Sequence, residues 1–197
     1  MQSYNGAQSI RARMNLSALA FVALAALGSE AACAAEVVCL GASGTQGYGL
    51  SSNEAFPAQL ETMLHAKGIN VTVSNVGISG DTTAGMLARF DSVVDSSTRV
   101  LVLQRGSNDS RDKIEKVKHG DAVVSRDKIA PAETKANIDQ IRAKAAARHI
   151  KVIDAQRFIA ALPDSARLGD AIGHPNAEGD RIVAAALLPL VIAALRN

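Results

Sequence analysis

A glycine-rich stretch near the start of the chain, residues 39–50 (CLGASGTQGYGL), contains a single serine, Ser43. Two different chemistries are compatible with such a loop. Its backbone N–H groups could bind the pyrophosphate of a dinucleotide, or the loop could expose Ser43 as a nucleophile. A nucleophilic serine also needs a general base, and His174 lies in a segment bounded by glycine and proline, GHPNAEG. We expect the other histidines to be surface residues, because they lie in helical or charged segments: His65, His119 and His149.

The segment GASGTQG has the glycine spacing of short-chain dehydrogenases, which is the argument for the dinucleotide alternative. That class of site also needs a carboxylate near the end of the second strand to bind the ribose, and residues 75–77 (NVG) supply none. Those dehydrogenases use a tyrosine and a lysine four residues apart, and neither Tyr4 nor Tyr48 is followed by such a lysine. A nucleotide-binding protein of this type is therefore the weaker alternative.

Short apolar segments alternate with segments of helical spacing along the chain, which predicts a parallel sheet with helices on both faces. The expected strands are residues 36–40, 71–76, 100–103 and 151–154. The expected helices are residues 56–66, 82–90, 131–148, 156–162 and 177–195, and residues 107–129 are expected to form a long loop with at most one helical turn.

The three most distinctive loops follow the first three expected strands, at Ser43, at Gly77 and at residues 106–109. Ligands of parallel sheets bind outside the carboxyl ends of the strands. We therefore expect these loops to converge on one edge of the sheet.

Four sequence blocks in this order resemble those of the SGNH hydrolases, also called the GDSL esterase/lipase family. The resemblance covers nearly the whole chain that follows the N-terminal segment. The blocks are GASG followed by TQGYG from residue 41, NVG within NVGISGDTT from residue 75, GSND from residue 106, and DAIGHPN from residue 170.

The resemblance implies a three-layer α/β/α, flavodoxin-like fold with a central parallel sheet. It implies that Ser43 attacks an ester carbonyl, that His174 removes the serine proton and that Asp170 orients the imidazole. By the family pattern, the oxyanion is bound by the backbone N–H groups of Ser43 and Gly77 and by the side-chain amide of Asn108.

This chain departs from the family pattern at two places. The aspartate that usually precedes the serine is Ala42, and the leucine that usually follows it is Gly44. Because that aspartate is not a member of the triad, its loss is expected to alter loop packing more than chemistry.

The second departure concerns the triad acid. Asp170 lies four residues before His174, where the family has three, so one residue is inserted. Gly173 can adopt backbone angles that let the loop bulge and restore the contact. The alternatives for the third member are a backbone carbonyl, Asp109 and Asp154.

The α/β-hydrolase fold, which has the same Ser, acid, His order, is a further alternative. Its nucleophile turn needs G-x-S-x-G, and the residue two after Ser43 is Thr45. No His, Cys and Asp cluster has metal-ligand spacing, so we expect neither a metal nor another cofactor.

The length of 197 residues indicates one domain, and 48% apolar with 20% charged residues is ordinary for a globular protein. A net charge of +2 without a basic run, and with only 2 tyrosines, 4 phenylalanines and no tryptophan, argues against nucleic acid as a partner.

The first residues are typical of a secretory signal peptide, which we expect to comprise residues 1–34 and to precede the hydrolase domain at residues 35–197. Arg11 and Arg13 precede an apolar run, residues 16–27, and a small-residue segment, SEAACAA, follows. The run is too short to span a bilayer comfortably.

Cleavage after residue 34 removes Cys33 and leaves Cys39 as the single thiol, which we expect to be buried in a strand. Lipidation of Cys33 is a less favoured alternative, because lipoprotein signals usually carry leucine where this chain has Glu30.

These features together predict an exported serine esterase that forms an acyl-enzyme on Ser43. The expected substrates are small carboxylic esters of the aryl ester, acyl ester, lysophospholipid or thioester type. The contrasting alternative is a non-catalytic or weakly active binding protein on the same fold.

Overall fold

The computed structural model describes residues 36–110, 113–116, 123–126 and 129–196. The predicted signal peptide, its cleavage site and Cys33 lie outside the described residues.

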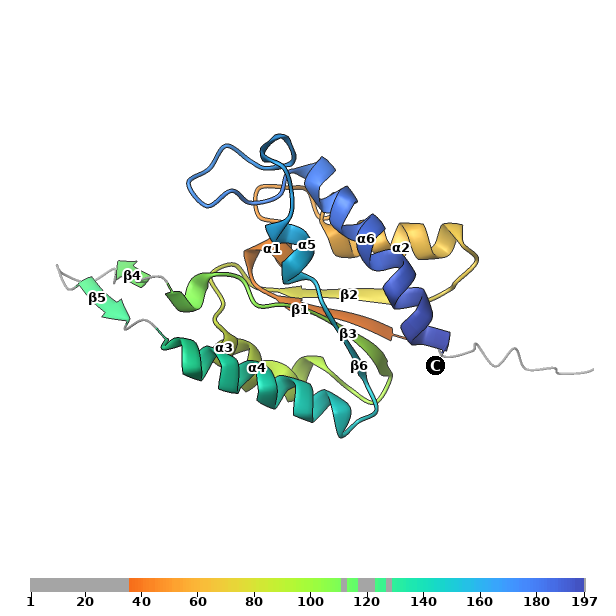
Figure 1. Ribbon diagram of the computed structural model, residues 1–197, viewed down its shortest axis with the longest axis horizontal. Coiled ribbons are helices and arrows are strands. Elements are labelled where there is room, and N and C mark those ends of the chain that lie inside the picture. The colour runs from red at the N-terminus through yellow and green to blue at the C-terminus, as the bar shows by residue number, and fades with distance from the viewer. Residues whose placement is uncertain (1–35, 111–112, 117–122, 127–128, 197) are drawn as a thin grey trace, which may run out of the picture. The chain divides into compact units, whose positions relative to one another are not determined.

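A four-stranded parallel sheet forms the centre of the described unit (Figure 1). The strand order is β2-β1-β3-β6, so β1 and β3 pair on both of their edges. Each contains a short apolar run, VVCL in β1 and VLVL in β3, as expected for strands buried on both faces. The strands are β1 (Glu36–Gly41), β2 (Thr72–Gly77), β3 (Thr98–Gln104) and β6 (Lys151–Asp154).

Helices cover both faces of this sheet, as Figure 1 shows. Helices α2 (Phe56–Ala66) and α6 (Ala177–Arg196) contribute to the core on one face, and α3 (Thr83–Val93) and α4 (Pro131–Ala146) to the core on the other. Successive side chains of a strand point to opposite faces, so Cys39 packs in the first core and Leu40 in the second. The predicted three-layer α/β/α fold is confirmed.

The segment between β3 and α4 differs from the predicted loop. It contains a 3₁₀ turn (Asn108–Ser110) and two antiparallel strands, β4 (Lys113–Lys116) and β5 (Val123–Arg126). Because the segment is polar and its apolar residues are only weakly periodic, the sequence pattern did not predict that these two strands pair. Two further short elements are helices α1 (Ser43–Gln46) and α5 (Gln156–Ala160), and a second 3₁₀ turn covers Asp164–Ala166.

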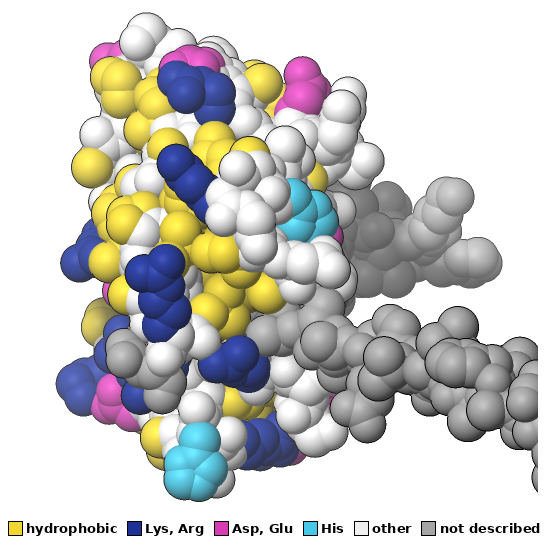
Figure 2. Space-filling view, turned by 90° about the vertical axis from the view of Figure 1, so that its right-hand side faces the viewer, with side chains coloured by type: hydrophobic (Ala, Val, Ile, Leu, Met, Phe, Trp, Pro, Cys, Tyr) yellow, Lys and Arg dark blue, Asp and Glu magenta, His cyan; other side chains and the backbone are white. Residues whose placement is uncertain are grey.

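The single cysteine of the described residues, Cys39, is fully buried in β1. Burial raises the pKa of its thiol far above the ordinary value, so the group stays neutral and unreactive. Figure 2 shows the end of the unit at which α6 terminates, where hydrophobic side chains lie among Lys and Arg side chains. Within the described ranges, no helix is long and apolar enough to cross a membrane.

A buried carboxyl group, that of Asp180 in α6, connects two helices of one layer. Its Oδ2 accepts the N–H of Phe56 at the start of α2 (3.1 Å), whereas Oδ1 has no hydrogen-bond partner among the described residues. Burial raises the pKa of Asp180 to about 7, although the N–H of Phe56 acts in the opposite direction. The unfolded chain releases this proton near about pH 4, so at intermediate pH the folded state binds more protons.

We therefore expect the free energy of unfolding to fall by a few kcal/mol as pH rises from about 4 to about 7, at a rate of up to about 1.4 kcal/mol per pH unit. Asp180→Asn should remove most of this fall, because asparagine does not ionise and its carbonyl can still accept the N–H of Phe56. Urea denaturation at a series of pH values measures it, with the exposed Asp139→Asn as control. Equal pH slopes in wild type and Asp180→Asn would contradict the assignment.

Candidate active site

Ser43 is the first residue of α1, directly beyond the carboxyl end of β1. The chain turns sharply there, and a Cβ at Gly41 would lie 2.1 Å from Thr45 Oγ1. Only glycine fits such a close approach. The turn places the Ser43 side chain over the edge of the sheet at the start of a short helix, a position that the glycines of the sequence indicated.

His174 lies in the loop before α6 and contacts Ser43 across 131 positions of sequence. Its Nε2 is 2.8 Å from Ser43 Oγ, and its Nδ1 contacts Asp170 Oδ2. A carboxylate only accepts, so Nδ1 carries the hydrogen and Nε2 is left to accept the hydroxyl hydrogen of Ser43. The imidazole is buried, and the ring of Tyr48 stacks on it with centroids 4.5 Å apart.

The extra residue between Asp170 and His174 is accommodated by a bulge. Gly173 has φ +71°, a conformation that favours glycine, and its N–H donates to Asp170 Oδ1 at 2.6 Å. The N–H of His174 donates to the same oxygen at 3.1 Å. The hydrogen bond from the His174 side chain, together with these two backbone donors, lowers the pKa of Asp170 to about 2. Asp170 is therefore ionised and directed at the imidazole.

The two other aspartates that the sequence left open are occupied elsewhere. Asp109 is buried and accepts the N–H of Thr83 (2.9 Å) and the hydroxyl of Thr134 (2.7 Å), so it connects α3 to α4. Asp154 Oδ1 accepts the N–H of Gln156 at 2.9 Å. Both aspartates therefore have structural partners of their own.

Arg167 anchors the histidine loop to the end of α5, a contribution that the sequence analysis missed. Its guanidinium donates to the carbonyl of Gly173 (2.8 Å) and to those of Ile159 (2.9 Å) and Leu162 (3.0 Å). Carbonyl partners for an arginine leave no mark in the sequence, because any residue can supply them.

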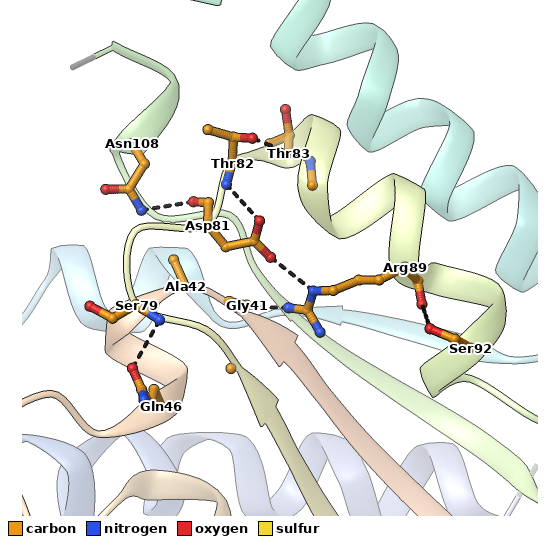
Figure 3. Close-up of polar contacts among 12 residues, drawn as sticks. Gly41, Ala42, Gln46, Ser79, Asp81, Thr82, Thr83, Arg89, Ser92 and Asn108 are labelled. Carbon is orange, nitrogen blue, oxygen red and sulfur yellow. Dashed lines mark hydrogen bonds and ion pairs between the residues drawn. The ribbon is translucent and has the colours of Figure 1, made fainter. Parts of the chain in front are cut away.

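Asn108 lies on the loop after β3, and Figure 3 shows its side chain directed at Asp81. Asn108 Nδ2 donates to the Asp81 carbonyl at 2.8 Å, and an amide nitrogen carries a second hydrogen. The Asp81 carboxylate pairs with Arg89 Nε at 2.9 Å, and Arg89 also donates to the carbonyl of Gly41 at 3.2 Å. These contacts hold the loop after β2, the loop after β3 and the end of β1 together.

Gly77 is not arranged as an oxyanion donor. Its N–H donates to Asn75 Oδ1 at 3.0 Å, and a Cβ there would lie 2.3 Å from the backbone nitrogen of Gln46. The glycine is needed for close packing of β2 against α1. The second glycine of NVGISGDTT is Gly80, which lies between Ser79 and Asp81. The N–H of Ser79 donates to Gln46 Oε1 at 2.9 Å, and the carbonyl of Asp81 accepts the hydrogen bond from Asn108.

A cleft of about 120 Å³ opens beside Ser43 and His174. Gly106 and Ser107 line one side, and Ile159 and Ile172 contribute apolar surface. Ile172 is 49% exposed, so hydrophobic surface is available to a ligand at the rim. A larger hollow of about 430 Å³ lies against α4 and shares only Ser107 with this cleft.

A serine, a histidine and an aspartate in contact at the carboxyl edge of a parallel sheet are the arrangement of a hydrolase of the Ser-His-Asp class. The chain matches the model of the GDSL-like Lipase/Acylhydrolase family over residues 39–153. It belongs to that family, which confirms the resemblance to the GDSL and SGNH hydrolases and excludes the short-chain dehydrogenase alternative.

Similar proteins include two esterases and a solved esterase structure. An arylesterase of Vibrio mimicus is 36% identical over 92 residues, 46% of this chain and 46% of that protein. Esterase TesA of Pseudomonas aeruginosa is 30% identical over 133 residues, 67% of this chain and 58% of that protein. The matches thus span about half the length of these relatives. A crystal structure of TesA, at 20% identity, covers 81% of this chain and 99% of that one with a TM-score of 0.64, which shows a common fold.

Proposed function

We propose that this chain is an exported serine esterase that hydrolyses small carboxylic esters through an acyl-enzyme on Ser43. The observation that carries the proposal is the unbroken series of contacts from Ser43 Oγ through the imidazole of His174 to Asp170. Membership of the GDSL-like family and the esterase relatives support the same reaction class.

The acylation step follows from the polarity of these contacts. His174 Nε2 removes the hydroxyl proton as Ser43 Oγ attacks the ester carbonyl, and Asp170 stabilises the imidazolium that forms. The imidazolium then returns the proton to the alkoxide leaving group, which departs as the alcohol. Water, deprotonated by the same imidazole, attacks the acyl-enzyme and releases the carboxylic acid, so Ser43 and His174 regain their starting state.

The oxyanion of each tetrahedral intermediate needs donors that are fixed before it forms. We assign this role to the backbone N–H of Ser43, at the N-terminus of α1, and to the free amide hydrogen of Asn108. Because the N–H of Gly77 already donates to Asn75, we propose the N–H of Gly80 as the third donor. Its position next to Asp81, which binds Asn108, supports this choice.

The size of the cleft supports small acyl groups. A volume of about 120 Å³ lies well below the roughly 300 Å³ at which ligand pockets for drug-sized molecules begin. Tyr48, stacked on His174 and 49% exposed, offers an aromatic face to the alcohol part of an ester. We therefore propose short-acyl aryl esters as the class of substrate to test first.

Titration with a fluorophosphonate tests the proposed function, because the reagent labels only serines that have been activated as nucleophiles. We expect one equivalent of label on Ser43, with simultaneous loss of hydrolysis of p-nitrophenyl acetate. Label absent from Ser43 in a folded protein would overturn the proposal and would favour a binding protein on the same fold.

Asn108→Ala should lower kcat by about 10²–10³-fold, the usual loss for one oxyanion donor. KM should change much less, because the contact strengthens only as charge develops on the carbonyl oxygen. Steady-state kinetics on p-nitrophenyl acetate measures both, with the exposed Asn70→Ala as control. Unchanged turnover in Asn108→Ala would reassign Asn108 to loop packing.

The export part of the proposal predicts a mature chain that begins near Ala35. The charged, apolar and small-residue regions of residues 1–34 support it. N-terminal sequencing of protein recovered from a periplasmic or extracellular fraction measures the cleavage site. Recovery of an intact Met1, or of a lipid on Cys33, would show this part to be wrong.

A further inference from the structure

Two glutamine side chains border the catalytic cleft, and the mechanism above does not use them. Gln104 is the last residue of β3 and is only 3% exposed. Gln156 is the first residue of α5 and is half-buried. Both line the cleft that contains Ser43 and His174.

Backbone donors determine which way each of these amides faces. The N–H of Ala42 donates to Gln104 Oε1 at 3.0 Å, and the hydroxyl of Thr45 donates to the same oxygen at 3.1 Å. The N–H of Gly106 donates to Gln156 Oε1 at 2.9 Å. A backbone nitrogen can only donate, so both oxygens are fixed. The remaining contact joins Gln104 Nε2 to Gln156 Oε1 at 3.1 Å, so Gln104 must donate this hydrogen bond and Gln156 must accept it.

The two ends of this chain of hydrogen bonds are the two loops that carry the reaction. Ala42 immediately precedes Ser43, and Gly106 lies two residues before Asn108. The loops are also in close contact, because a Cβ at Gly106 would lie 2.9 Å from the Cβ of Ala42. The glutamine pair therefore connects the segment before Ser43 to the segment before Asn108.

We propose that Gln104 and Gln156 are positioning residues, which hold the nucleophile loop and the Asn108 loop at the separation that oxyanion binding needs. The inference rests on the proposed function and adds a requirement to it: the hydrogen between the two side chains must belong to Gln104. A small error in donor placement weakens transition-state binding far more than substrate binding, so kcat should respond and KM should not.

The isosteric change Gln104→Glu tests the polarity. The introduced carboxylate still accepts from Ala42 and Thr45, but its second oxygen faces Gln156 Oε1 without a hydrogen. Rotation of the Gln156 amide cannot repair the contact, since its NH₂ group would then face the N–H of Gly106. Protonation repairs it, because the neutral carboxyl group accepts with one oxygen and donates with the other.

We therefore expect kcat of Gln104→Glu to be about tenfold or more below that of wild type at pH 8, with KM nearly unchanged. The ratio of variant to wild-type kcat should rise as pH falls to about 5, because the buried carboxyl group becomes protonated. The charged or titratable groups that share this environment are His174, Arg167 and Asp154, and all three are present in both proteins. The exposed Gln140→Glu is the matched control, with no pH-dependent ratio expected.

A second pair of variants substitutes the half-buried Gln156 and leaves the buried Gln104 unchanged. Gln156→Met keeps the length of the side chain but removes the acceptor, and it should lower kcat about tenfold. Gln156→Glu restores an acceptor for both Gln104 and Gly106, and should recover most of that loss at pH 8.

A pH-independent ratio for Gln104→Glu, or equal kcat for Gln156→Met and Gln156→Glu, would overturn the inference. If Gln104→Glu does not fold, the Gln156 pair decides the question alone. Failure of the proposed function would look different, because the wild-type protein itself would then show no esterase activity that depends on Ser43.

Discussion

Replacing Ser43 with alanine is expected to abolish ester hydrolysis, with kcat lower by roughly 10⁶-fold, as in other serine hydrolases whose nucleophile is removed. The change deletes the atom that attacks the carbonyl, and His174 Nε2 loses the hydroxyl from which it accepts a hydrogen bond at 2.8 Å. The fold should be unaffected, because the backbone turn at the end of β1 depends on Gly41 and Thr45 rather than on the serine hydroxyl.

Hydrolysis of p-nitrophenyl acetate and fluorophosphonate labelling both measure this loss, and thermal unfolding checks the fold. Ser52→Ala is a suitable control, because Ser52 is exposed and lies in the same connection between α1 and α2. Turnover at the wild-type level in Ser43→Ala would assign the nucleophile to another residue.

Asp170→Asn is expected to have the second largest effect, a fall in kcat of about 10⁴-fold. The reason is the tautomer of His174. An amide NH₂ group in place of the carboxylate oxygen favours an unprotonated Nδ1 and moves the hydrogen to Nε2. That nitrogen then cannot accept the proton of Ser43. The two backbone N–H groups that now donate to Asp170 Oδ1 can donate to the asparagine carbonyl, so the loop should keep its shape.

Asp154→Asn is the matched control, because Asp154 is exposed and its partners are Gln156 and Arg142 rather than His174. Asp109→Asn should act on stability instead, since Asp109 is buried between α3 and α4. A nearly neutral Asp170→Asn would identify the enzyme as a Ser–His dyad, in which Ser43 and His174 keep their roles.

The layer architecture could be predicted from the sequence because its signals are local. Short apolar or β-branched runs located the four sheet strands, and the helical spacing of apolar residues located the long helices; α2 was predicted to the residue, Phe56–Ala66. The hairpin of β4 and β5 was missed, since strand pairing in a polar segment depends on register rather than on hydrophobic pattern.

In the candidate site, too, some features could be predicted from the sequence and others could not. The sequence by itself indicated Ser43 and His174 as the residues suited to nucleophilic chemistry, because their loops carry distinctive residue types. It favoured Asp170 as the triad acid over a backbone carbonyl, Asp109 and Asp154, but it could not show that the contact forms across the inserted residue. In the folded loop Gly173 has a left-handed conformation, and Asp170 contacts the imidazole.

The supporting contacts were determined by tertiary structure alone. Gln104 and Gln156 lie 52 positions apart, and Arg167 bonds to carbonyl groups that every residue possesses. The hydrogen bond from the N–H of Gly77 to Asn75 is local in sequence, but residue type does not show that this side chain turns back onto the backbone. The physical reason is common to all three cases. Residue type specifies which hydrogen bonds a group is able to make, whereas the direction and distance of its partners are set by the conformation of the folded chain.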